Sequence, residues 1–322
     1  MSIAALRDLI GDDLRRVDEV IRASLYSDVA LIRQVAEYTI SAGGKRLRPA
    51  LVLLSARTFD YRGTSHYDLA AVVEFIHTAT LLHDDVVDAS ELRRGRASAN
   101  ALFGNDAAVL VGDFLYSRAF QLMVSVNNMR VLEVLADATN TIAEGEVLQL
   151  VNSHSVEVDA ESYLKVIRYK TAKLFEAAAR IGAIVGGASR DEENAFGEYG
   201  MHLGTAFQLV DDVLDYSGDA ETTGKNLGDD LSEGKSTLPL IYAMQHGGPE
   251  QAELIREAVR RGGREKFTGV ATAIIETGAL AFTRDQAQAQ ANMAKRALAP
   301  FRRSRYVDCL LQLADFSVTR DY

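Results

Sequence analysis

Residues 81–88 read LLHDDVVD, and residues 208–215 repeat the pattern as QLVDDVLD. Side chains four residues apart lie on the same face of an α-helix, about 6 Å apart along its axis. The first and last aspartate of each motif therefore lie one above the other, and the second aspartate turns to the neighbouring face. Like charges at this spacing repel one another, and carboxylates beside an apolar stripe cost desolvation energy. The pattern indicates that a cation compensates six carboxylates: Asp84, Asp85, Asp88, Asp211, Asp212 and Asp215.

Magnesium is the cation that this pattern favours, because Mg²⁺ takes oxygen ligands from one or two carboxylates, waters and substrate phosphates. A single motif of this kind is more often a solvated helix face. Here both copies lie inside apolar runs, and both lead into loops rich in glycine and basic residues. We therefore expect the two motifs to form facing walls of one Mg²⁺–phosphate site.

Composition limits the class of protein. The chain has 322 residues, 48% of them hydrophobic, with four prolines, no tryptophan and a formal charge of −10. This balance favours helices, and the negative charge argues against a nucleic-acid partner. The one cysteine, Cys309, excludes an intrachain disulfide and is expected to be a small core residue. No apolar run reaches the roughly 18–20 residues of a membrane span, and the acidic N-terminus is unlike a signal peptide, so we expect a cytoplasmic protein.

Two basic turns supply candidate anion-binding groups. Residues 41–49 read SAGGKRLRP, in which the two glycines end one helix and Pro49 lies in the first turn of the next. Cations at a helix N-terminus add to a dipole that already favours anions. A second basic segment, ELRRGR at residues 91–96, follows the first aspartate motif directly. The cations of the two turns are Lys45, Arg46, Arg48, Arg93, Arg94 and Arg96.

The rest of the chain reads as helices. Two helices are expected within residues 1–40, and a further one carries the first motif from Asp68 to Asp88. The polar segment from Ser217 to Lys235 is long for a structureless connection and indicates a lid or binding loop. No strand-like alternation and no convincing domain boundary is present. We expect one all-α domain over residues 1–322, a bundle of about ten or more helices around a central apolar cavity.

Other chemistries are less consistent with the sequence. It contains none of the motifs GxxxxGK[ST], GxGxxG, GxSxG, CxxC or HExxH. Glu74 and His77 form one Glu-x-x-His pair, but a di-iron site would need a second pair in a matching helix. A helical scaffold without chemistry does not explain why cationic and anionic groups alternate along the chain. The pattern instead fits ionisation of an allylic diphosphate, with cations on the leaving group and an apolar pocket that excludes water.

Five segments in order carry a resemblance to a known family. They are GGKRLRP at residues 43–49, the first DDxxD followed by RRG, the pair Lys170–Thr171, FQLVDDVLD at 207–215, and GKNLGDDLSEGK at 224–235. Over nearly the whole chain the sequence resembles the trans-isoprenyl diphosphate synthases, the polyprenyl synthetase family. The resemblance implies an all-α homodimer that condenses isopentenyl diphosphate with an allylic diphosphate. It further implies three Mg²⁺ ions with bound diphosphate, and pyrophosphate rather than a side chain as the proton acceptor.

The resemblance also implies a role for each matched residue. The six aspartates would hold Mg²⁺ and, with Lys170 and Lys225, form the catalytic set. The allylic diphosphate would contact Arg93, Lys170, Thr171, Gln208, Lys225 and Lys235. Isopentenyl diphosphate would contact Lys45, Arg48, His77 and Arg94. On the spacing alone, His77 lies two helical turns before Asp84 on the same face, which leaves a ligand role and a structural role open.

Product length depends on the helix face below the first motif. Ala79 lies five residues before Asp84, where short-chain members of the family have an aromatic residue near that position. The first motif also lacks the two-residue insertion of bacterial farnesyl-type enzymes. Both features predict a deep tunnel past Ala79, Ile76 and Val72, with Met123 as a candidate floor.

The resemblance to the family implies octaprenyl diphosphate as the product, for quinone side chains such as that of ubiquinone, made from a farnesyl diphosphate primer. The alternative products are nonaprenyl, decaprenyl and geranylgeranyl diphosphate. The alternative functions are those of a class I terpene cyclase and of a non-catalytic partner subunit. A cyclase would normally carry a different second motif and lack the GGKRLRP turn, and a partner subunit would be expected to lose one aspartate motif. A transient contact with a membrane surface is expected for product release.

Overall fold

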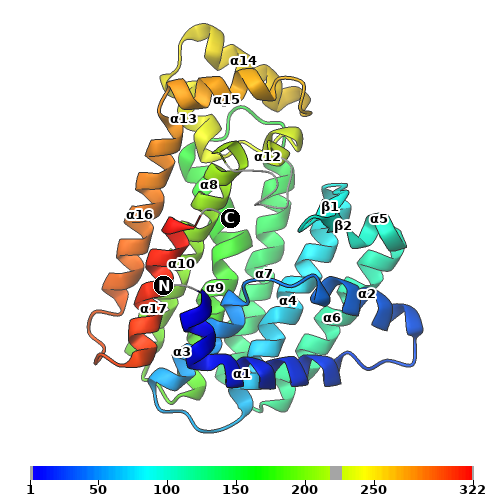
Figure 1. Cartoon of the computed structure of the whole chain (residues 1–322), viewed down its shortest axis with the longest axis vertical. Helices are drawn as coiled ribbons and strands as arrows, with labels where there is room; N and C mark the ends of the chain where they lie inside the picture. The colour runs from blue at the N-terminus through cyan, green and yellow to red at the C-terminus, as the bar shows by residue number, and fades with distance from the viewer. Residues whose placement is uncertain (1–2, 218–226, 321–322) are drawn as a thin grey trace. The chain divides into compact units, whose positions relative to one another are not determined.

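The computed structural model describes residues 3–217 and 227–320, and nearly all its regular elements are α-helices (Figure 1). This confirms the predicted all-α class. The first elements are α1 (Ile3–Ser24), α2 (Ala30–Ser41), α3 (Leu47–Thr58), α4 (Ser65–Val87), β1 (Leu92–Arg93), β2 (Arg96–Ala97), α5 (Ala99–Phe103), α6 (Asn105–Ser125) and α7 (Met129–Asn152). They are followed by α8 (Ala160–Ile167), the π-helical turn η1 (Arg168–Ala172), α9 (Lys173–Val185), α10 (Arg190–Ser217), α12 (Asp229–Ser232), α13 (Leu238–His246), α14 (Pro249–Arg261), α15 (Phe267–Glu276), α16 (Ala279–Ala297) and α17 (Arg305–Thr319).

The chain gathers into two compact units, each built from separate stretches. Unit one comprises Met1–Thr139, Leu174–Gly200 and Ala297–Leu313. Unit two comprises Asn140–Lys173, Met201–Arg296 and Ala314–Tyr322. The unit boundaries fall inside α7, α9, α10, α16 and α17. The expectation of a single domain over residues 1–322 stays a prediction.

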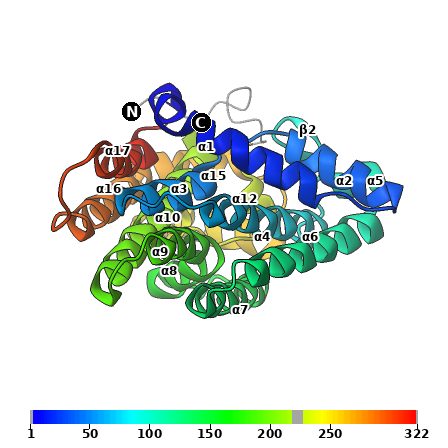
Figure 2. The ribbon, with the colours of Figure 1, turned by 90° about the horizontal axis from the view of Figure 1, so that it is seen from below.

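The core of unit one is built on α3 and α4. The α3 sequence LRPALVLLSA is apolar on all faces, and a helix of that kind is buried all round. Residues from Ala50 to Ala56 are accordingly inaccessible to solvent. The helices α4 and α6 lie side by side and share the longest packed surface of the unit (Figure 2). A Cβ atom at Gly182 of α9 would collide with the Val52 carbonyl, so this glycine lets α9 approach α3 closely.

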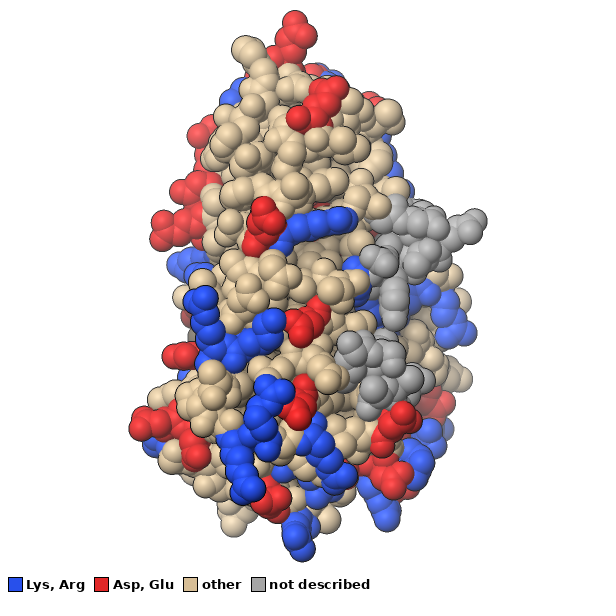
Figure 3. Space-filling view, turned by 60° about the vertical axis from the view of Figure 1, so that its left-hand side comes forward, with Lys and Arg blue, Asp and Glu red and all other residues tan. Residues whose placement is uncertain are grey.

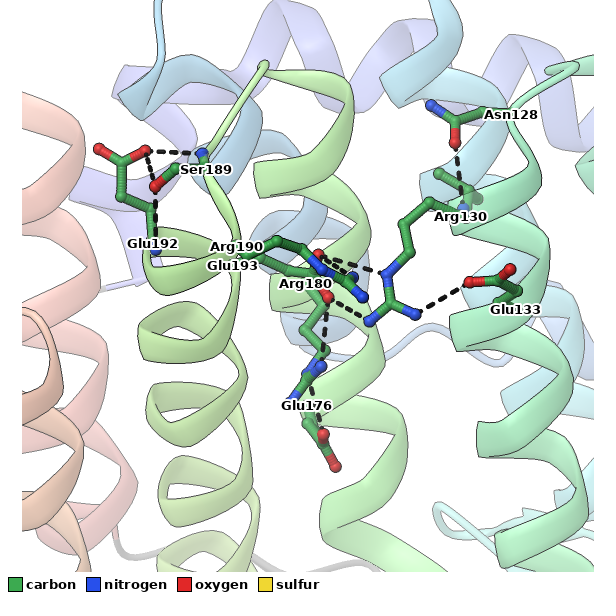
Figure 4. Close-up of polar contacts among 10 residues, drawn as sticks. Asn128, Arg130, Glu133, Glu176, Arg180, Ser189, Arg190, Glu192 and Glu193 are labelled. Carbon is green, nitrogen blue, oxygen red and sulfur yellow. Dashed lines mark hydrogen bonds and ion pairs between the residues drawn. The ribbon is translucent and has the colours of Figure 1, made fainter.

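A buried ion cluster ties α7, α9 and α10 together at one end of unit one (Figure 4). Its centre is Glu193, which is 2% exposed. Arg130 donates to Glu193 Oε1 at 2.6 Å, Arg180 approaches the same oxygen at 3.2 Å, and Arg190 lies 3.0 Å from Oε2. Burial tends to raise the pKa of Glu193, but the hydrogen bonds from Arg130 and Arg190 outweigh it and lower that pKa. Three helix segments are therefore fixed by one carboxylate.

Unit two has its own apolar core. The helices α13, α14 and α15 pack on one another, and Tyr216 stacks on Phe267 with ring centroids 6.1 Å apart (Figure 1). Of the predicted lid segment from Ser217 to Lys235, residues 218–226 lie outside the described part. The remainder contains the short helix α12, so this part of the segment is not structureless.

The surface carries mixed charge and one apolar helix. On the face drawn in Figure 3, lysine and arginine side chains are interspersed with aspartate and glutamate. Among the described residues, α6 alone is long and apolar enough to cross a membrane, judged by length and composition, and a third of its apolar window, 33%, is buried. A helix that covers a protein interface has the same properties. Cys309 is buried, and burial raises the pKa of its thiol to about 11.

Candidate active site

The first aspartate motif lies at the C-terminal end of α4. The helix stops because Ala89 adopts a left-handed conformation, with a φ of 49°. The Ser90 amide then donates to the Asp85 carbonyl at 2.9 Å, and the Ala89 amide to the Val86 carbonyl at 3.3 Å, which is a Schellman arrangement. The Asn100 side chain also donates to the Asp85 carbonyl, at 3.1 Å. Carboxylates at this end of a helix face the negative pole of its dipole, which adds to the need for a compensating cation.

The three aspartates of this motif have different surroundings. Asp85 is 3% exposed and accepts hydrogen bonds from Arg93, with Nε at 2.9 Å from Oδ1. Burial raises the pKa of Asp85 against the lowering effect of Arg93. The pKa of Arg93 is raised, because its bond to Asp85 and the field of the three carboxylates outweigh its burial. Asp84 and Asp88 are half-buried, as expected from their shared helix face.

The basic turn before α3 meets the hairpin that follows the first motif. Arg94, at the tip of β1–β2, packs on Gly44, where a Cβ atom would lie 2.9 Å from Arg94 Nη2. Arg48 Nη1 lies 3.2 Å from His77 Nε2, and its guanidinium stands over the Phe175 ring, 4.4 Å from the centroid. Burial, followed by the charges of Arg48 and Arg94, lowers the pKa of His77 well below its usual range, so the ring is neutral.

Arg46 has a different role from its neighbours in this turn. Its guanidinium pairs with Glu74 of α4 and lies 3.6 Å from Asp18. Lys45 is half-buried beside it. Arg46, to which the resemblance gives no role, is therefore neutralised within unit one.

The second motif lies in the last two turns of α10, and its middle aspartate is again the most buried. Asp212 is 1% exposed. It accepts a hydrogen bond from the Tyr163 hydroxyl on Oδ2 and one from Gln208 Nε2 on Oδ1, at 2.8 Å. Burial, followed by the charge of Asp230, raises the pKa of Asp212 well above the usual range of a carboxyl group.

Asp211 and Asp215 are half-buried and have partners of other kinds. Arg320 Nη1 donates to Asp211 at 2.7 Å, while its Nη2 donates to the Phe207 carbonyl at 2.5 Å. The guanidinium also covers the Phe207 ring, 3.7 Å from the centroid. The Asp215 carboxylate accepts the backbone amides of the first two residues of α12, at 3.2 and 3.3 Å, and so draws the end of the loop back to the motif.

Lys170 and Thr171 lie on η1, a π-helical turn between α8 and α9. Single π-helical turns inside α-helices are frequent at functional sites. Lys170 pairs with Glu146 of α7 at 2.6 Å, and the Thr171 hydroxyl donates to Gln208 Oε1 at 3.1 Å. Gly145 permits this packing, since a Cβ atom there would lie 2.6 Å from the Lys170 amide nitrogen.

The remaining predicted residues lie as follows. Lys225 is outside the described residues. Lys235 is half-buried and pairs with Glu233. The chain-length positions Val72, Ile76 and Ala79 on α4 and Met123 on α6 are all fully buried in unit one.

Each unit brings together part of the predicted site. Unit one holds the first motif, the two basic turns and His77, and unit two holds the second motif with Thr171, Gln208, Lys170 and Lys235. The expectation that the two motifs face each other stays a prediction. Sequence reasoning missed Tyr163, Arg320 and Glu146. In the sequence, the polar pair Lys170–Thr171 interrupts an apolar helical pattern at the π-helical turn, but nothing local marks Tyr163 or Arg320 as partners of the second motif.

The donor set fits magnesium in one particular way. Among the described residues no group of three or more histidine, cysteine, aspartate or glutamate side chains forms a ready-made metal cage. The half-buried pairs Asp84–Asp88 and Asp211–Asp215 instead offer one or two carboxylates each. Mg²⁺ is commonly held by one or two carboxylates together with substrate phosphates, and the arginines beside the first motif could receive those phosphates.

Known proteins match the chain over its full length. The family model for polyprenyl synthetase matches residues 29–276. Octaprenyl diphosphate synthase of Escherichia coli strain K12 is 50% identical over 322 residues, all of both chains. The all-trans-nonaprenyl-diphosphate synthase (geranyl-diphosphate specific) of Rhodobacter capsulatus is 43% identical over 312 residues, 97% of this chain and 96% of that one. A crystal structure of polyprenyl synthase from Caulobacter crescentus CB15, complexed with calcium and isoprenyl diphosphate, has a TM-score of 0.97 and 48% identity over 100% of this chain and 98% of that chain.

The all-α fold, the paired aspartate motifs and their basic neighbours are those of a prenyltransferase. The chain belongs to the polyprenyl synthetase family.

Proposed function

We propose that this protein makes octaprenyl diphosphate, adding isopentenyl diphosphate units in sequence to an allylic diphosphate primer, farnesyl diphosphate. The observation that carries the proposal is the presence in unit one of an aspartate–arginine motif and of a separate cluster of two cations and a neutral histidine, Arg48, Arg94 and His77. The full-length similarity to octaprenyl diphosphate synthase supports the product class. Nonaprenyl, decaprenyl and geranylgeranyl diphosphate are the alternative products.

In the allylic half of the site, the first and last aspartates of each motif would hold Mg²⁺ against the diphosphate. Bound Mg²⁺ would supply charge neutralisation of the departing pyrophosphate. Asp85 fixes Arg93, whose guanidinium then presents its remaining donors to the diphosphate. The other proposed contacts to the allylic diphosphate are Lys170, Thr171, Gln208, Lys225 and Lys235. We propose that three Mg²⁺ ions accompany the bound diphosphate.

In the homoallylic half, Lys45, Arg48 and Arg94 would bind the diphosphate of isopentenyl diphosphate. The neutral ring of His77 can accept a hydrogen bond from Arg48 and donate one from its other nitrogen, which suits an orienting contact. The alkene of isopentenyl diphosphate is the nucleophile. Released pyrophosphate is well placed chemically to accept the proton, so no side-chain base is required.

The product chain would grow along the buried face of α4. The side chains at Val72, Ile76 and Ala79 are small or branched, and Ala79 leaves more room than an aromatic residue would. Met123 of α6 is a candidate floor, because α6 packs alongside α4 and the Met123 side chain is inaccessible to solvent.

The active form would be a homodimer joined through α6. This helix exposes Val109, Leu110, Phe120 and Val124, at 37%, 66%, 39% and 61% of their surfaces, along one side. An exposed apolar stripe of this kind marks an interaction surface. The proposal places the enzyme in the cytoplasm, with a transient membrane-surface contact when the long apolar product leaves. It includes no nucleic-acid partner.

A product assay tests the proposal directly. The protein is incubated with Mg²⁺, farnesyl diphosphate and labelled isopentenyl diphosphate, and the dephosphorylated products are sized by chromatography. Octaprenyl alcohol as the longest main product is expected. Cyclised hydrocarbon released without incorporation of label would indicate a cyclase, and absence of any product from the purified chain would indicate a partner subunit. Either result would overturn the proposed function.

A further inference from the structure

Asp212 is enclosed by donors from its own unit. The hydroxyl of Tyr163 on α8 donates to Oδ2, and Gln208, one turn earlier on α10, donates from Nε2 to Oδ1 at 2.8 Å. Tyr163 is 5% exposed and Asp212 1% exposed, so both groups are removed from water. Both carboxylate oxygens of Asp212 are thus engaged by the protein.

The contact continues beyond Asp212 to the π-helical turn. Gln208 Oε1 accepts a hydrogen bond from Thr171 Oγ1 at 3.1 Å. The Tyr163 hydroxyl occupies Oδ2, so Oδ1 is the oxygen that faces Gln208, and it accepts from the Gln208 amide nitrogen. An accepting Oδ1 requires the amide nitrogen of Gln208 to face it, and the amide oxygen must then face Thr171. One chain of hydrogen bonds therefore joins Tyr163, Asp212, Gln208 and the Thr171 hydroxyl.

The Tyr163–Asp212 end of this network is buried, and the Gln208–Thr171 end is half-buried. In surroundings of low dielectric, each hydrogen bond is electrostatically stronger than in water, and an unpaired member is costly. The Thr171 hydroxyl, with its hydrogen committed to Gln208, keeps its oxygen lone pairs for whatever lies on its other side. An oxygen acceptor at that place suits positive charge that develops on an allylic carbon.

We infer that Tyr163 is a positioning residue for condensation: through Asp212 and Gln208 it orients Thr171, and Asp212 acts in this chain of hydrogen bonds rather than as a ligand of Mg²⁺. The inference deepens the proposed function and rests on it. It assigns the middle aspartate of the second motif a different task from Asp211 and Asp215.

The test compares Tyr163→Phe with Tyr199→Phe. Tyr199 is a matched control, because it is fully buried in unit one and its hydroxyl also donates one hydrogen bond, to the Leu310 carbonyl at 2.7 Å. Both variants lose one buried hydroxyl group and are expected to lose similar thermal stability. Tyr163→Phe is expected to lower kcat for single addition of isopentenyl diphosphate about tenfold, and Tyr199→Phe less than about twofold.

Magnesium dependence separates positioning from metal binding. The Mg²⁺ concentration for half-maximal rate is expected to change less than about twofold in Tyr163→Phe and in Asp212→Asn, because neither change removes a metal ligand. A second readout needs no turnover: the rise in melting temperature on adding Mg²⁺ with pyrophosphate is expected to persist in both variants and to be lost in Asp84→Asn. A strongly raised Mg²⁺ requirement in Asp212→Asn would overturn the inference.

A double-variant cycle with Thr171→Val tests whether the effect travels through Thr171. Tyr163→Phe is expected to slow the native enzyme but not the Thr171→Val enzyme. Equal slowing in both backgrounds, or a Tyr163→Phe enzyme as fast as the native one, would overturn the inference while leaving the proposed function standing. If Tyr163→Phe fails to fold, Asp212→Asn is put through the same cycle. An inactive native protein would overturn the proposed function and the inference with it.

Discussion

Asp84 and Asp85 are neighbours in the chain but lie in unlike surroundings. Asp85 is buried against Arg93, whereas Asp84 is half-buried and shares its helix face with Asp88. Asp212 repeats the pattern, with Tyr163 and Gln208 in place of the arginine. The second position of each motif therefore holds a carboxylate that organises other side chains. The first and last positions of each motif are half-buried.

Arg93→Lys is expected to impair the enzyme although it keeps the positive charge. Lysine cannot form the two-nitrogen contact that Arg93 makes with Asp85, so Asp85 loses part of its compensation and the diphosphate loses an oriented donor. We expect kcat/KM for the allylic diphosphate to fall at least about tenfold. Arg96→Lys is the control on the same hairpin, because Arg96 is exposed and only stands over the Tyr38 ring. Equal kinetics for the two variants would contradict the assigned role of Arg93.

His66 is expected to make stability depend on pH. It is fully buried between Tyr61 and Tyr67, and burial, followed by the charge of Arg57, lowers its pKa from 6.5 to about 4. Above pH 6.5 His66 is mainly neutral in both the folded and the unfolded chain, so its full contribution to the free energy of unfolding is present. As pH falls from 6.5 towards 4, the unfolded chain binds the proton first, so the free energy of unfolding falls.

At pH 5 this loss amounts to about 2 kcal/mol relative to pH 7. Urea unfolding of the native protein and of His66→Phe at both pH values measures it. The variant is expected to lose about 2 kcal/mol less than the native protein between the two pH values. Identical losses would show that His66 binds its proton equally well in both states.

At the scale of the element, the candidate site residues lie where a helix ends or changes pitch. The left-handed Ala89 ends α4 directly after the first motif, and η1 interrupts the α8–α9 segment at Lys170 and Thr171. The capping of α12 by Asp215 closes the loop onto α10. Functional side chains thus lie at the irregular points of regular helices.

Gly145→Ala is expected to disturb η1. The added Cβ atom would lie 2.6 Å from the Lys170 amide nitrogen, so the π-helical turn must move away from α7. We expect a stability loss of about 1–3 kcal/mol and a fall in kcat, measured by thermal unfolding and the condensation assay. Gly11→Ala in α1 is the control, since nothing lies within 4 Å of its new Cβ atom and alanine favours a helix. A fully active, fully stable Gly145→Ala enzyme would show that η1 is not held by this contact.

Ala79→Tyr is expected to shorten the product while condensation continues. Ala79 is fully buried on the α4 face below the first motif, and a phenol ring there would block a growing prenyl chain. Product sizing against the native enzyme measures the change. Ala299→Tyr, at an exposed position, is the control for the size of the substitution. Unchanged product length in Ala79→Tyr would place the chain elsewhere.

Many of the helices could be predicted from the sequence. The helix expected from Asp68 to Asp88 is α4, Ser65–Val87, because its apolar spacing is long and regular. The hairpin β1–β2 was missed, since strands of two residues show no alternation. The partners Tyr163–Asp212 and Arg320–Asp211 are 49 and 109 residues apart, and only tertiary packing brings them together. The local sequence pattern therefore predicted the charged motifs but not the side chains that orient them.

At the scale of the whole molecule, chain order and spatial grouping differ. Unit one takes its residues from three separate stretches, and so does unit two. Composition and periodicity correctly predicted the helical class, since both depend on local sequence. The grouping into units depends on long-range packing, which no local pattern records.

Leu110→Glu is expected to dissociate the proposed homodimer. Leu110 is 66% exposed on the apolar stripe of α6, and a buried, unpaired carboxylate at an interface is costly. Light scattering after size exclusion is expected to give the mass of two chains for the native protein and of one chain for the variant. Ile275→Glu on α15 is the control, because Ile275 is 64% exposed but lies outside the stripe. A native protein that elutes as a single chain would contradict the dimer.

The burial of Cys309 has a practical consequence for spectroscopy. Thiols react as thiolates, so a buried thiol with a pKa of about 11 is inert to maleimide and methanethiosulfonate reagents near neutral pH. New cysteines introduced at exposed positions of each unit would therefore take spin labels or fluorophores selectively in an otherwise native chain. Paired labels of this kind would report how far apart the two aspartate motifs are, and whether Mg²⁺ with a diphosphate draws them together.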